Sequence, residues 1–236
     1  MAEPIRPSTQ LLANRSPFTL ITVDGETLVG EVASPIGNST GAILCLHPLP
    51  TAGGMMDSHI LKKAANRLPD MAGITVVRFN TRGTTSANGT STGNFDNGIA
   101  EKFDVEAALT YCLDTLKLEN LWIVGWSFGT DLALKFARDS RVKGLILLSP
   151  PLRTSEASDL EFWAKDSRPI TALIPEFDDY LKPEAAAVAF KDVPQIKLID
   201  VKEAKHLWVG EPAVYRVLTE ITEILSPQSL PLPAEI

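Results

Sequence analysis

Apolar residues along the chain fall into short continuous runs that alternate with segments of three-to-four spacing. The first two runs, residues 19–23 and 27–32, are separated by Asp24-Gly25-Glu26, and an Asp-Gly pair is typical of a hairpin turn. Six later runs are apolar almost throughout, as strands covered by helices on both faces are. These predicted strands are residues 42–46, 75–79, 121–124, 145–148, 171–174 and 196–201.

The segments between these runs have the spacing of amphipathic helices. One apolar face recurs from Val105 to Leu116, and a second recurs from Val214 to Leu225. Residues 81–98 are instead rich in Gly, Ser, Thr and Asn, which predicts a long loop. The alternation predicts an α/β fold: a mostly parallel, doubly wound sheet of about eight strands with an antiparallel N-terminal start.

The chain of 236 residues fits one α/β domain. We expect that domain to span residues 17–226, after an N-terminal extension (1–16) and before a Pro-rich tail (227–236). Residues 1–15 lack the continuous apolar stretch of a secretory signal, and no apolar run is long enough to cross a bilayer. The expected location is therefore the cytoplasm.

The net charge limits the classes of binding partner, and the cysteines indicate buried thiols. The formal net charge is −7 and no basic run occurs, which disfavours nucleic acid and anionic membrane as partners. Cys45 and Cys112 both lie in apolar segments, where we expect reduced, buried thiols. The remaining partner class is a small molecule.

One motif indicates a catalytic function. The apolar run 121–124 leads into Gly125-Trp126-Ser127-Phe128-Gly129, and a helical run follows. This is G-x-S-x-G between a strand and a helix, the pattern that places a nucleophilic serine on a sharp turn. Side chains two residues away from Ser127 would clash with a turn this tight, which explains glycine at both positions. The sequence predicts that Ser127 is a nucleophile.

A serine hydroxyl needs a base within hydrogen-bond reach. The chain has three histidines, His47, His59 and His206. His206 follows the last predicted strand in a short loop before the C-terminal helix, where a base would reach the turn of Ser127. His47 ends an earlier strand and His59 begins a helix, so both are interpreted as structural.

The base in turn needs an orienting carboxylate, expected after a strand that lies between Ser127 and His206 in the sequence. The run 171–174 is followed by three acids, Glu176, Asp178 and Asp179. Spacing alone does not separate them.

Taken together, the serine motif, the acidic turn and the histidine loop resemble the α/β-hydrolase superfamily over about residues 17–225. The resemblance implies that Asp178 is the acid, with Pro175 where the family commonly has glycine. It extends to four further segments of the chain. His47-Pro48-Leu49-Pro50, Gly53 to Asp57, Arg78 to Gly83 and Gly93 to Gly98 are similar to a subgroup of small capless proteins described as predicted serine esterases or dienelactone-hydrolase-like proteins.

The same resemblance implies an oxyanion hole made of two backbone N–H groups. One belongs to Phe128, directly after the nucleophile. The other comes from the loop 47–50, in which Pro48 and Pro50 have no N–H, so Leu49 is the candidate. The implied reaction is hydrolysis of a carboxylic ester or thioester through an acyl-enzyme on Ser127.

This reaction requires no cofactor and no metal, and the sequence has no cluster of His and Cys ligands. The expected substrate is a small acyl compound. The alternatives are a serine peptidase or acyltransferase on the same fold, or a non-catalytic binding protein.

The segment between the runs 145–148 and 171–174 has room for one helix and no cap domain, so we expect an open site. We expect apolar side chains to line that site. The candidates are Trp126, Trp208, Met55, Met56, Phe162 and Trp163.

Overall fold

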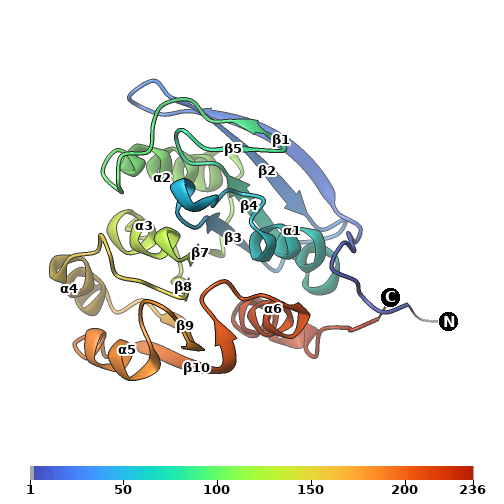
Figure 1. Cartoon of the computed structure of the whole chain (residues 1–236). Helices are drawn as coiled ribbons and strands as arrows, with labels where there is room; N and C mark the ends of the chain where they lie inside the picture. Colours follow the sequence, from blue (N-terminus) through green and yellow to red (C-terminus); the bar gives the residue numbers. More distant parts are fainter. Residues whose placement is uncertain (1–2, 236) are drawn as a thin grey trace.

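A computed structural model describes residues 3–235, and it places an eight-stranded sheet between two layers of helices (Figure 1). The strand order is β1-β2-β4-β3-β7-β8-β9-β10, and all neighbours are parallel except β1–β2 and β2–β4. This confirms the predicted fold class. The strands are β1 (Asn14–Ile21), β2 (Thr27–Ser34), β3 (Gly41–Leu46), β4 (Ile74–Phe79), β7 (Leu121–Trp126), β8 (Leu145–Leu148), β9 (Ile170–Phe177) and β10 (Ile196–Lys205).

The antiparallel start forms around the predicted Asp-Gly turn. Gly25 has φ 92°, a left-handed conformation that costs glycine little, and its N–H donates to the carbonyl of Thr22 at 2.9 Å. The N–H of Thr22 donates in turn to the carbonyl of Glu26 at 2.9 Å. The turn therefore fixes the register of β1 on β2.

Alternation along the central strands produces a core on each face of the sheet. In β3, Leu44 and Leu46 pack toward one helix layer, whereas Ile43 and Cys45 pack toward the other. Helices α2 to α5 cover the first face, and α1 and α6 cover the second (Figure 1). The helices are α1 (His59–Ala72), α2 (Glu101–Thr110), α3 (Phe128–Phe136), α4 (Ala157–Asp166), α5 (Pro183–Ala189) and α6 (Glu211–Leu225).

The two cysteines are free and buried, on opposite faces of the sheet: Cys45 in the core beneath α1 and α6, Cys112 in the core beneath α2 to α5. Burial raises the pKa of the Cys45 thiol to about 12, and it also raises the pKa of Cys112. Neither thiol is therefore ionised near neutral pH.

Several strands run further at the carboxyl end than the sequence predicted, and β1 begins five residues earlier. β7 continues through Gly125 to Trp126, β9 through Pro175 to Phe177, and β10 to Lys205. Glycine, proline and charged residues weaken a strand pattern in sequence, but pairing with neighbouring strands holds them here. One helix, α4, and no cap connects β8 to β9, as expected.

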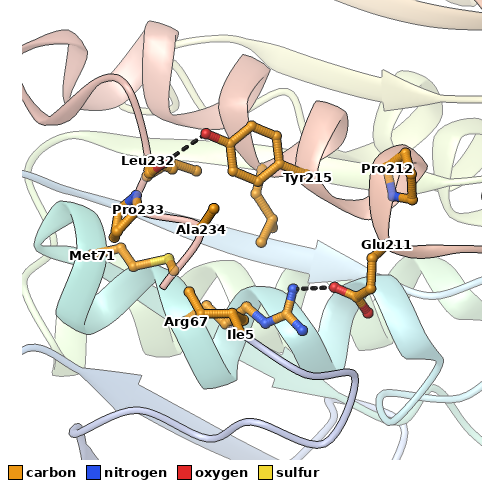
Figure 2. A pocket seen from close by; sticks show the side chains of 10 residues that line it. Ile5, Arg67, Met71, Glu211, Pro212, Tyr215, Leu232, Pro233 and Ala234 are labelled. Carbon is orange, nitrogen blue, oxygen red and sulfur yellow. Dashed lines mark hydrogen bonds and ion pairs between the residues drawn. The ribbon is translucent and has the colours of Figure 1, made fainter. Parts of the chain in front are cut away.

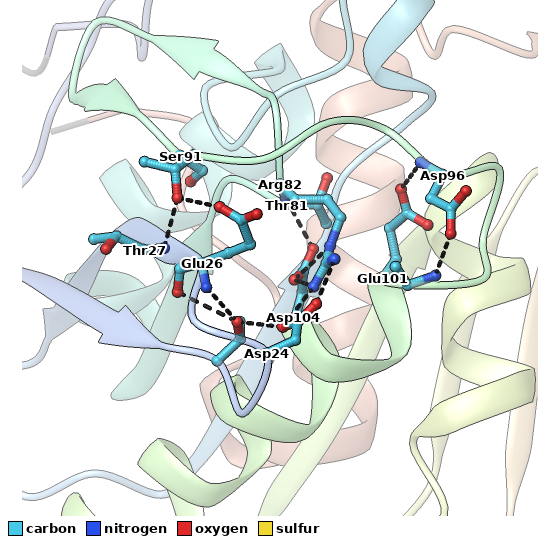
Figure 3. Close-up of polar contacts among 12 residues, drawn as sticks. Asp24, Glu26, Thr27, Thr81, Arg82, Ser91, Asp96, Glu101 and Asp104 are labelled. Carbon is cyan, nitrogen blue, oxygen red and sulfur yellow. Dashed lines mark hydrogen bonds and ion pairs between the residues drawn. The ribbon is translucent and has the colours of Figure 1, made fainter.

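Ion pairs hold the segment predicted as a long loop in place. It contains a two-residue hairpin, β5 (Thr85–Ser86) with β6 (Gly89–Thr90). Its Arg82 guanidinium donates to Asp104 of α2 at 2.8 Å and to Asp24 of the first hairpin at 2.8 Å (Figure 3). Hydrogen bonds from Arg82 are the main cause that lowers the pKa of Asp24 to about 2.

The far end of this segment is held by Glu101, which is fully buried. Its carboxylate accepts the backbone N–H of Asp96 and of Gly98, each at 2.8 Å (Figure 3). Phe95 and Asn97, which flank Asp96, are thereby placed at fixed positions beside the carboxyl ends of the strands.

The two ends of the described chain lie side by side (Figure 1). The N–H of Ile5 donates to the carbonyl of Ala234 at 3.0 Å, and Leu232 is buried. β1 begins at Asn14, inside the segment predicted as an extension, while residues 1, 2 and 236 lie outside the described residues. Within residues 3–235, no helix is both long and apolar enough to cross a membrane.

Candidate active site

Ser127 occupies a strained turn between β7 and α3. Its φ is 51° and its ψ −121°, a backbone conformation that costs a non-glycine residue free energy. The turn is held from both sides: the N–H of Ser127 donates to Leu148 at 2.9 Å, and its carbonyl accepts the N–H of Thr130 at 2.8 Å. Strain of this kind, fixed by its surroundings, is typical of functional positions.

The glycines of the motif are required by space. A Cβ on Gly125 would lie 2.5 Å from the carbonyl oxygen of Gly129, and a Cβ on Gly129 would lie 2.1 Å from that of Leu46. Both distances are far below van der Waals contact with backbone atoms that cannot move aside. The turn therefore excludes any side chain two residues before or after Ser127.

The structure brings Ser127, His206 and Asp178 together in one chain of hydrogen bonds. His206 Nε2 lies 2.8 Å from Ser127 Oγ, and His206 Nδ1 lies 2.9 Å from Asp178 Oδ2. Their exposed fractions are only 9%, 5% and 3%. The arrangement can move a proton from the serine hydroxyl to an imidazole whose other nitrogen faces a carboxylate.

Asp178 is also the acid that the structure selects among the three. Burial raises its pKa, but the hydrogen bond to His206 and the N–H groups of Tyr180 and Leu181 outweigh that effect, so its pKa is lowered. Glu176 instead accepts the N–H of Glu203 at 2.9 Å. A carboxylate that stays ionised faces the imidazole.

The loop that carries His206 is fixed by three side-chain donors that the sequence did not identify. Trp126 Nε1 and Ser149 Oγ both donate to the carbonyl of His206, each at 3.2 Å. His59 Nε2 donates to the next carbonyl, that of Leu207, at 2.7 Å. His59, which the sequence indicated as structural, thus has a specific role: it anchors the histidine loop to α1.

His47 orients the loop that was expected to supply an oxyanion donor. Its Nε2 accepts the N–H of Thr81 at 3.0 Å, so the proton resides on Nδ1, which donates to the carbonyl of Pro48 at 2.7 Å. Burial lowers the pKa of His47 to about 4, which keeps the ring neutral at pH 7. Because C=O and N–H point in opposite directions across a trans peptide, the N–H of Leu49 points away from His47.

The N–H groups of Leu49 and Phe128 have no acceptor among residues 3–235. Phe128 is the first residue of α3, where the N–H has no partner within the helix. Both residues border the same cavity as Ser127. Two free donors are thus available beside the serine.

That cavity has a volume of about 330 Å³ and opens above Ser127 and His206. Its apolar walls include Phe95 and Leu207, and its polar walls include Asn97, Arg153 and Tyr180. Tyr180 and Leu207 are close in sequence to Asp178 and His206, a proximity that could have identified them. Nothing in the sequence pointed to Arg153.

The expected lining of the pocket was wrong. Trp126, Trp208, Met55 and Met56 do not border the cavity; Met56 and both tryptophans are buried, with Trp126 and Trp208 in the core beneath α1 and α6. Trp126 ends β7, where alternation along the strand turns its side chain to the face opposite α3, whereas Met55, Met56 and Trp208 lie in loops outside the strands.

The two aromatic residues of α4 also lie elsewhere. Trp163 is fully buried beneath α3, where its Nε1 donates to the carbonyl of Leu134 at 2.9 Å, and Phe162 packs beside it. They belong to the core and not to the site.

No group of three His, Cys, Asp or Glu side chains within residues 3–235 is arranged to hold a metal ion. The acid–base groups that the structure brings together at the site are those of Ser127, His206 and Asp178.

Comparison with known families identifies this architecture. A family model of the alpha/beta hydrolase fold matches residues 41–198, which include β3, β7 and the turn of Ser127. The chain belongs to the alpha/beta hydrolase family. A curated relative, an uncharacterized protein of Rickettsia prowazekii, is 33% identical over 137 residues, and the match spans 57% of this chain and 56% of that protein.

Solved structures share the fold over almost the whole chain. A lidless α/β serine hydrolase from Xanthomonas campestris has a TM-score of 0.71 and 26% identity, covering 96% of this chain and 99% of that one. An α/β serine hydrolase homologue from Coxiella burnetii has a TM-score of 0.71 at 23% identity, covering 92% and 100%. An esterase from Pyrococcus furiosus has a TM-score of 0.70 at 18% identity, covering 95% and 100%. These structures confirm the fold.

Proposed function

We propose that the protein is a serine hydrolase that cleaves a carboxylic ester or thioester through an acyl-enzyme on Ser127. The observation that carries the proposal is the continuous hydrogen-bond chain from Ser127 Oγ through His206 to Asp178. A buried serine on a strained turn with this partner has the geometry of an activated nucleophile.

The reaction proceeds in two halves. Ser127 Oγ attacks the carbonyl carbon while His206 Nε2 takes the hydroxyl proton. His206 then gives that proton to the leaving oxygen or sulfur, which departs as an alcohol or thiol. Water repeats the attack on the acyl-enzyme, releases the carboxylic acid and restores the hydroxyl of Ser127. Asp178 keeps the proton of the neutral imidazole on Nδ1 and stabilises the imidazolium that forms.

The negative charge that develops on the carbonyl oxygen needs donors that are already in place. The free N–H groups of Leu49 and Phe128 border the cavity beside Ser127, and we assign them this role. The neutral His47 holds the first donor through Pro48, and the N-terminus of α3 supports the second.

Related proteins support the same class of reaction. The neighbour from Xanthomonas campestris is described as a serine hydrolase without a lid, and that from Pyrococcus furiosus as an esterase. An open cavity of about 330 Å³ suits a small ester or thioester more than a folded polypeptide chain.

Labelling with a fluorophosphonate, followed by peptide mapping, tests the proposal. We expect one modified residue, Ser127, and no labelling of Ser127→Ala. Hydrolysis of p-nitrophenyl esters should exceed that of peptide anilides. Modification elsewhere, or equal labelling of the variant, would refute the assignment. Faster cleavage of anilides than of esters would indicate that the protein is a peptidase and not an esterase.

A further inference from the structure

Arg153 is an exposed cation at the wall of the cavity that contains Ser127. Within residues 3–235, its guanidinium has no ion-pair partner and no hydrogen-bond acceptor. It lies over the ring of Tyr180, 5.8 Å from the centroid, and that ring packs against His206 at 4.6 Å between centroids. Arg153 borders the cavity, and its guanidinium carries five N–H donors that have no acceptor among residues 3–235, so it can bind an anion there.

The backbone of Arg153 is anchored to the helix that begins at the nucleophile. Asp131, in the first turn of α3, is fully buried and accepts the N–H of Arg153 at 3.2 Å, the N–H of Thr154 at 3.4 Å and the hydroxyl of Ser155 at 2.6 Å. Lys135 of the same helix donates to the carbonyl of Thr154 at 3.2 Å. Burial raises the pKa of Asp131, because removal from water disfavours the charged form of its carboxyl group. The loop that presents Arg153 is held at a fixed place relative to Ser127.

The charges around the cavity favour a monoanion. Arg153 is the one lysine or arginine among the described residues of the wall, and Asp131 is the one acidic residue there, with its oxygens already engaged by the loop. The side-chain amide of Asn97, on the wall as well, also has no hydrogen-bond partner among residues 3–235. One guanidinium and one amide match a single carboxylate, whereas a phosphate dianion would lack a second cation.

We propose that the substrate is an ester or thioester that carries a free carboxylate away from the bond that is cleaved, and that Arg153 binds this carboxylate with help from Asn97. The inference rests on the proposed function of Ser127 and adds the class of substrate. Arg153 is then a specificity-determining residue that takes no part in the proton transfers.

Two pairs of probes test the inference and place the carboxylate. p-Nitrophenyl hydrogen adipate against p-nitrophenyl hexanoate tests the acyl side. 4-Acetoxybenzoate against its methyl ester tests the leaving-group side. In one of the two pairs, the charged probe should have the higher kcat/KM, and added salt should reduce the preference.

Substitution of Arg153 should remove that preference alone. We expect Arg153→Ala to lower kcat/KM for the favoured charged probe about tenfold, mainly through KM, and to change its neutral partner less than about twofold. Arg153→Lys should retain part of the preference, because it keeps the charge and loses the planar fork. Arg141→Ala is the matched control, since Arg141 is exposed and pairs with Asp114 and Asp139 away from the cavity.

The same preference should appear in binding without turnover. Calorimetric titration of Ser127→Ala with each probe should give tighter binding of the charged member of the favoured pair, and the added Arg153→Ala substitution should abolish the difference. No preference in either pair, or an equal loss for both members in Arg153→Ala of unchanged melting temperature, would overturn the inference and leave the proposed function standing. Absence of turnover for all four probes together with absence of fluorophosphonate labelling would refute the proposed function itself.

Discussion

The cavity above Ser127 and a second cavity both combine charged side chains with apolar walls, but only the first of these two contains the hydrogen-bonded serine and histidine. The cavity above Ser127 measures about 330 Å³. The other, about 240 Å³, lies between α1, α6 and the two ends of the chain (Figure 2). In that second cavity Arg67, which is 3% exposed, donates to Glu211 at 2.8 Å and to the carbonyl of Arg6 at 2.9 Å.

The two cavities differ in how many of their polar groups lack a hydrogen-bond partner. Both terminal nitrogens of Arg67 are engaged, and the hydroxyl of Tyr215 donates to Leu232 at 2.6 Å, so these contacts join the chain ends to the helices (Figure 2). Around Ser127, the N–H of Leu49 and the guanidinium of Arg153 have no acceptor among residues 3–235. Arg67 Nε in the second cavity is also buried without an acceptor among residues 3–235, so a buried charge with an unpartnered donor is not enough to make a site; the cavity above Ser127 adds a hydroxyl that is hydrogen-bonded to an imidazole.

The largest expected effect separates the two neighbouring acids. Asp178→Asn should lower kcat by roughly 10³ to 10⁴, because the amide favours the wrong tautomer of His206 and removes the charge that stabilises its imidazolium. Asp179 is exposed, and the carboxylate hydrogen-bonded to His206 is that of Asp178, so Asp179→Asn should change kcat less than about tenfold. Steady-state kinetics on a p-nitrophenyl ester measures both.

Thermal melts of both variants distinguish lost chemistry from unfolding. Equal and severe defects in two folded variants would mean that the acids share the role. A severe defect in Asp179→Asn alone would move the assignment to that residue.

The next effect concerns the neutral histidine behind the oxyanion donor. His47→Gln should lower kcat by about tenfold to a hundredfold with little change in KM. Removal of an oxyanion donor itself lowers kcat by about 10² to 10³. The expected effect of His47→Gln is smaller because His47 acts only through the peptide of Pro48 and Leu49. A rise in KM at unchanged kcat would instead indicate a role in substrate binding.

Stability should depend on pH through the same residue. Burial lowers the pKa of His47 to about 4 from its ordinary 6.5, so between these values the unfolded chain binds a proton that the folded protein does not. This contribution to the free energy of unfolding is complete above about pH 6.5 and is lost as the pH falls toward about 4. From pH 7 to pH 5 the loss should be about 2 kcal/mol.

Urea unfolding of wild type and His47→Gln at both pH values measures this loss. His59, whose pKa burial also lowers, acts in the same direction in both proteins, so the difference between them isolates His47. Equal pH dependence in the two proteins would show that His47 is protonated to the same extent in the folded and unfolded states.

The smallest effect on activity is expected in the second cavity. Glu211→Gln weakens the pairs of Glu211 with Arg67 and Lys63 and should lower the free energy of unfolding by about 1 kcal/mol, because Glu211 is partly exposed. kcat/KM on the same ester should stay within about twofold of wild type. A tenfold loss of activity without unfolding would show that the second cavity communicates with the site.

The sequence by itself determined the fold class and pointed to Ser127 as the candidate nucleophile. Continuous apolar runs specify strands buried on both faces, and the Asp-Gly pair specifies the first hairpin, because both are local consequences of side-chain burial and backbone conformation. Gly125 and Gly129 mark the turn of Ser127 for an equally local reason, since the backbone passes too close for a Cβ. The position of His206 after the last strand followed from the order of the elements.

The resemblance to a known family implied Asp178 as the acid, but only the tertiary structure shows which acid faces the histidine and which side chains form the cavity. Spacing left Glu176, Asp178 and Asp179 open, because the direction of each carboxylate depends on how β9 pairs with β10 and on the N–H groups that receive it. Trp126, the last residue of β7, faces the layer of α1 and α6 because alternation along the strand sets its direction, and Trp208, in the loop between β10 and α6, is buried in the same core. Arg153 could not be identified at all, because its place beside Tyr180 depends on Asp131 holding a loop more than twenty residues further along the chain.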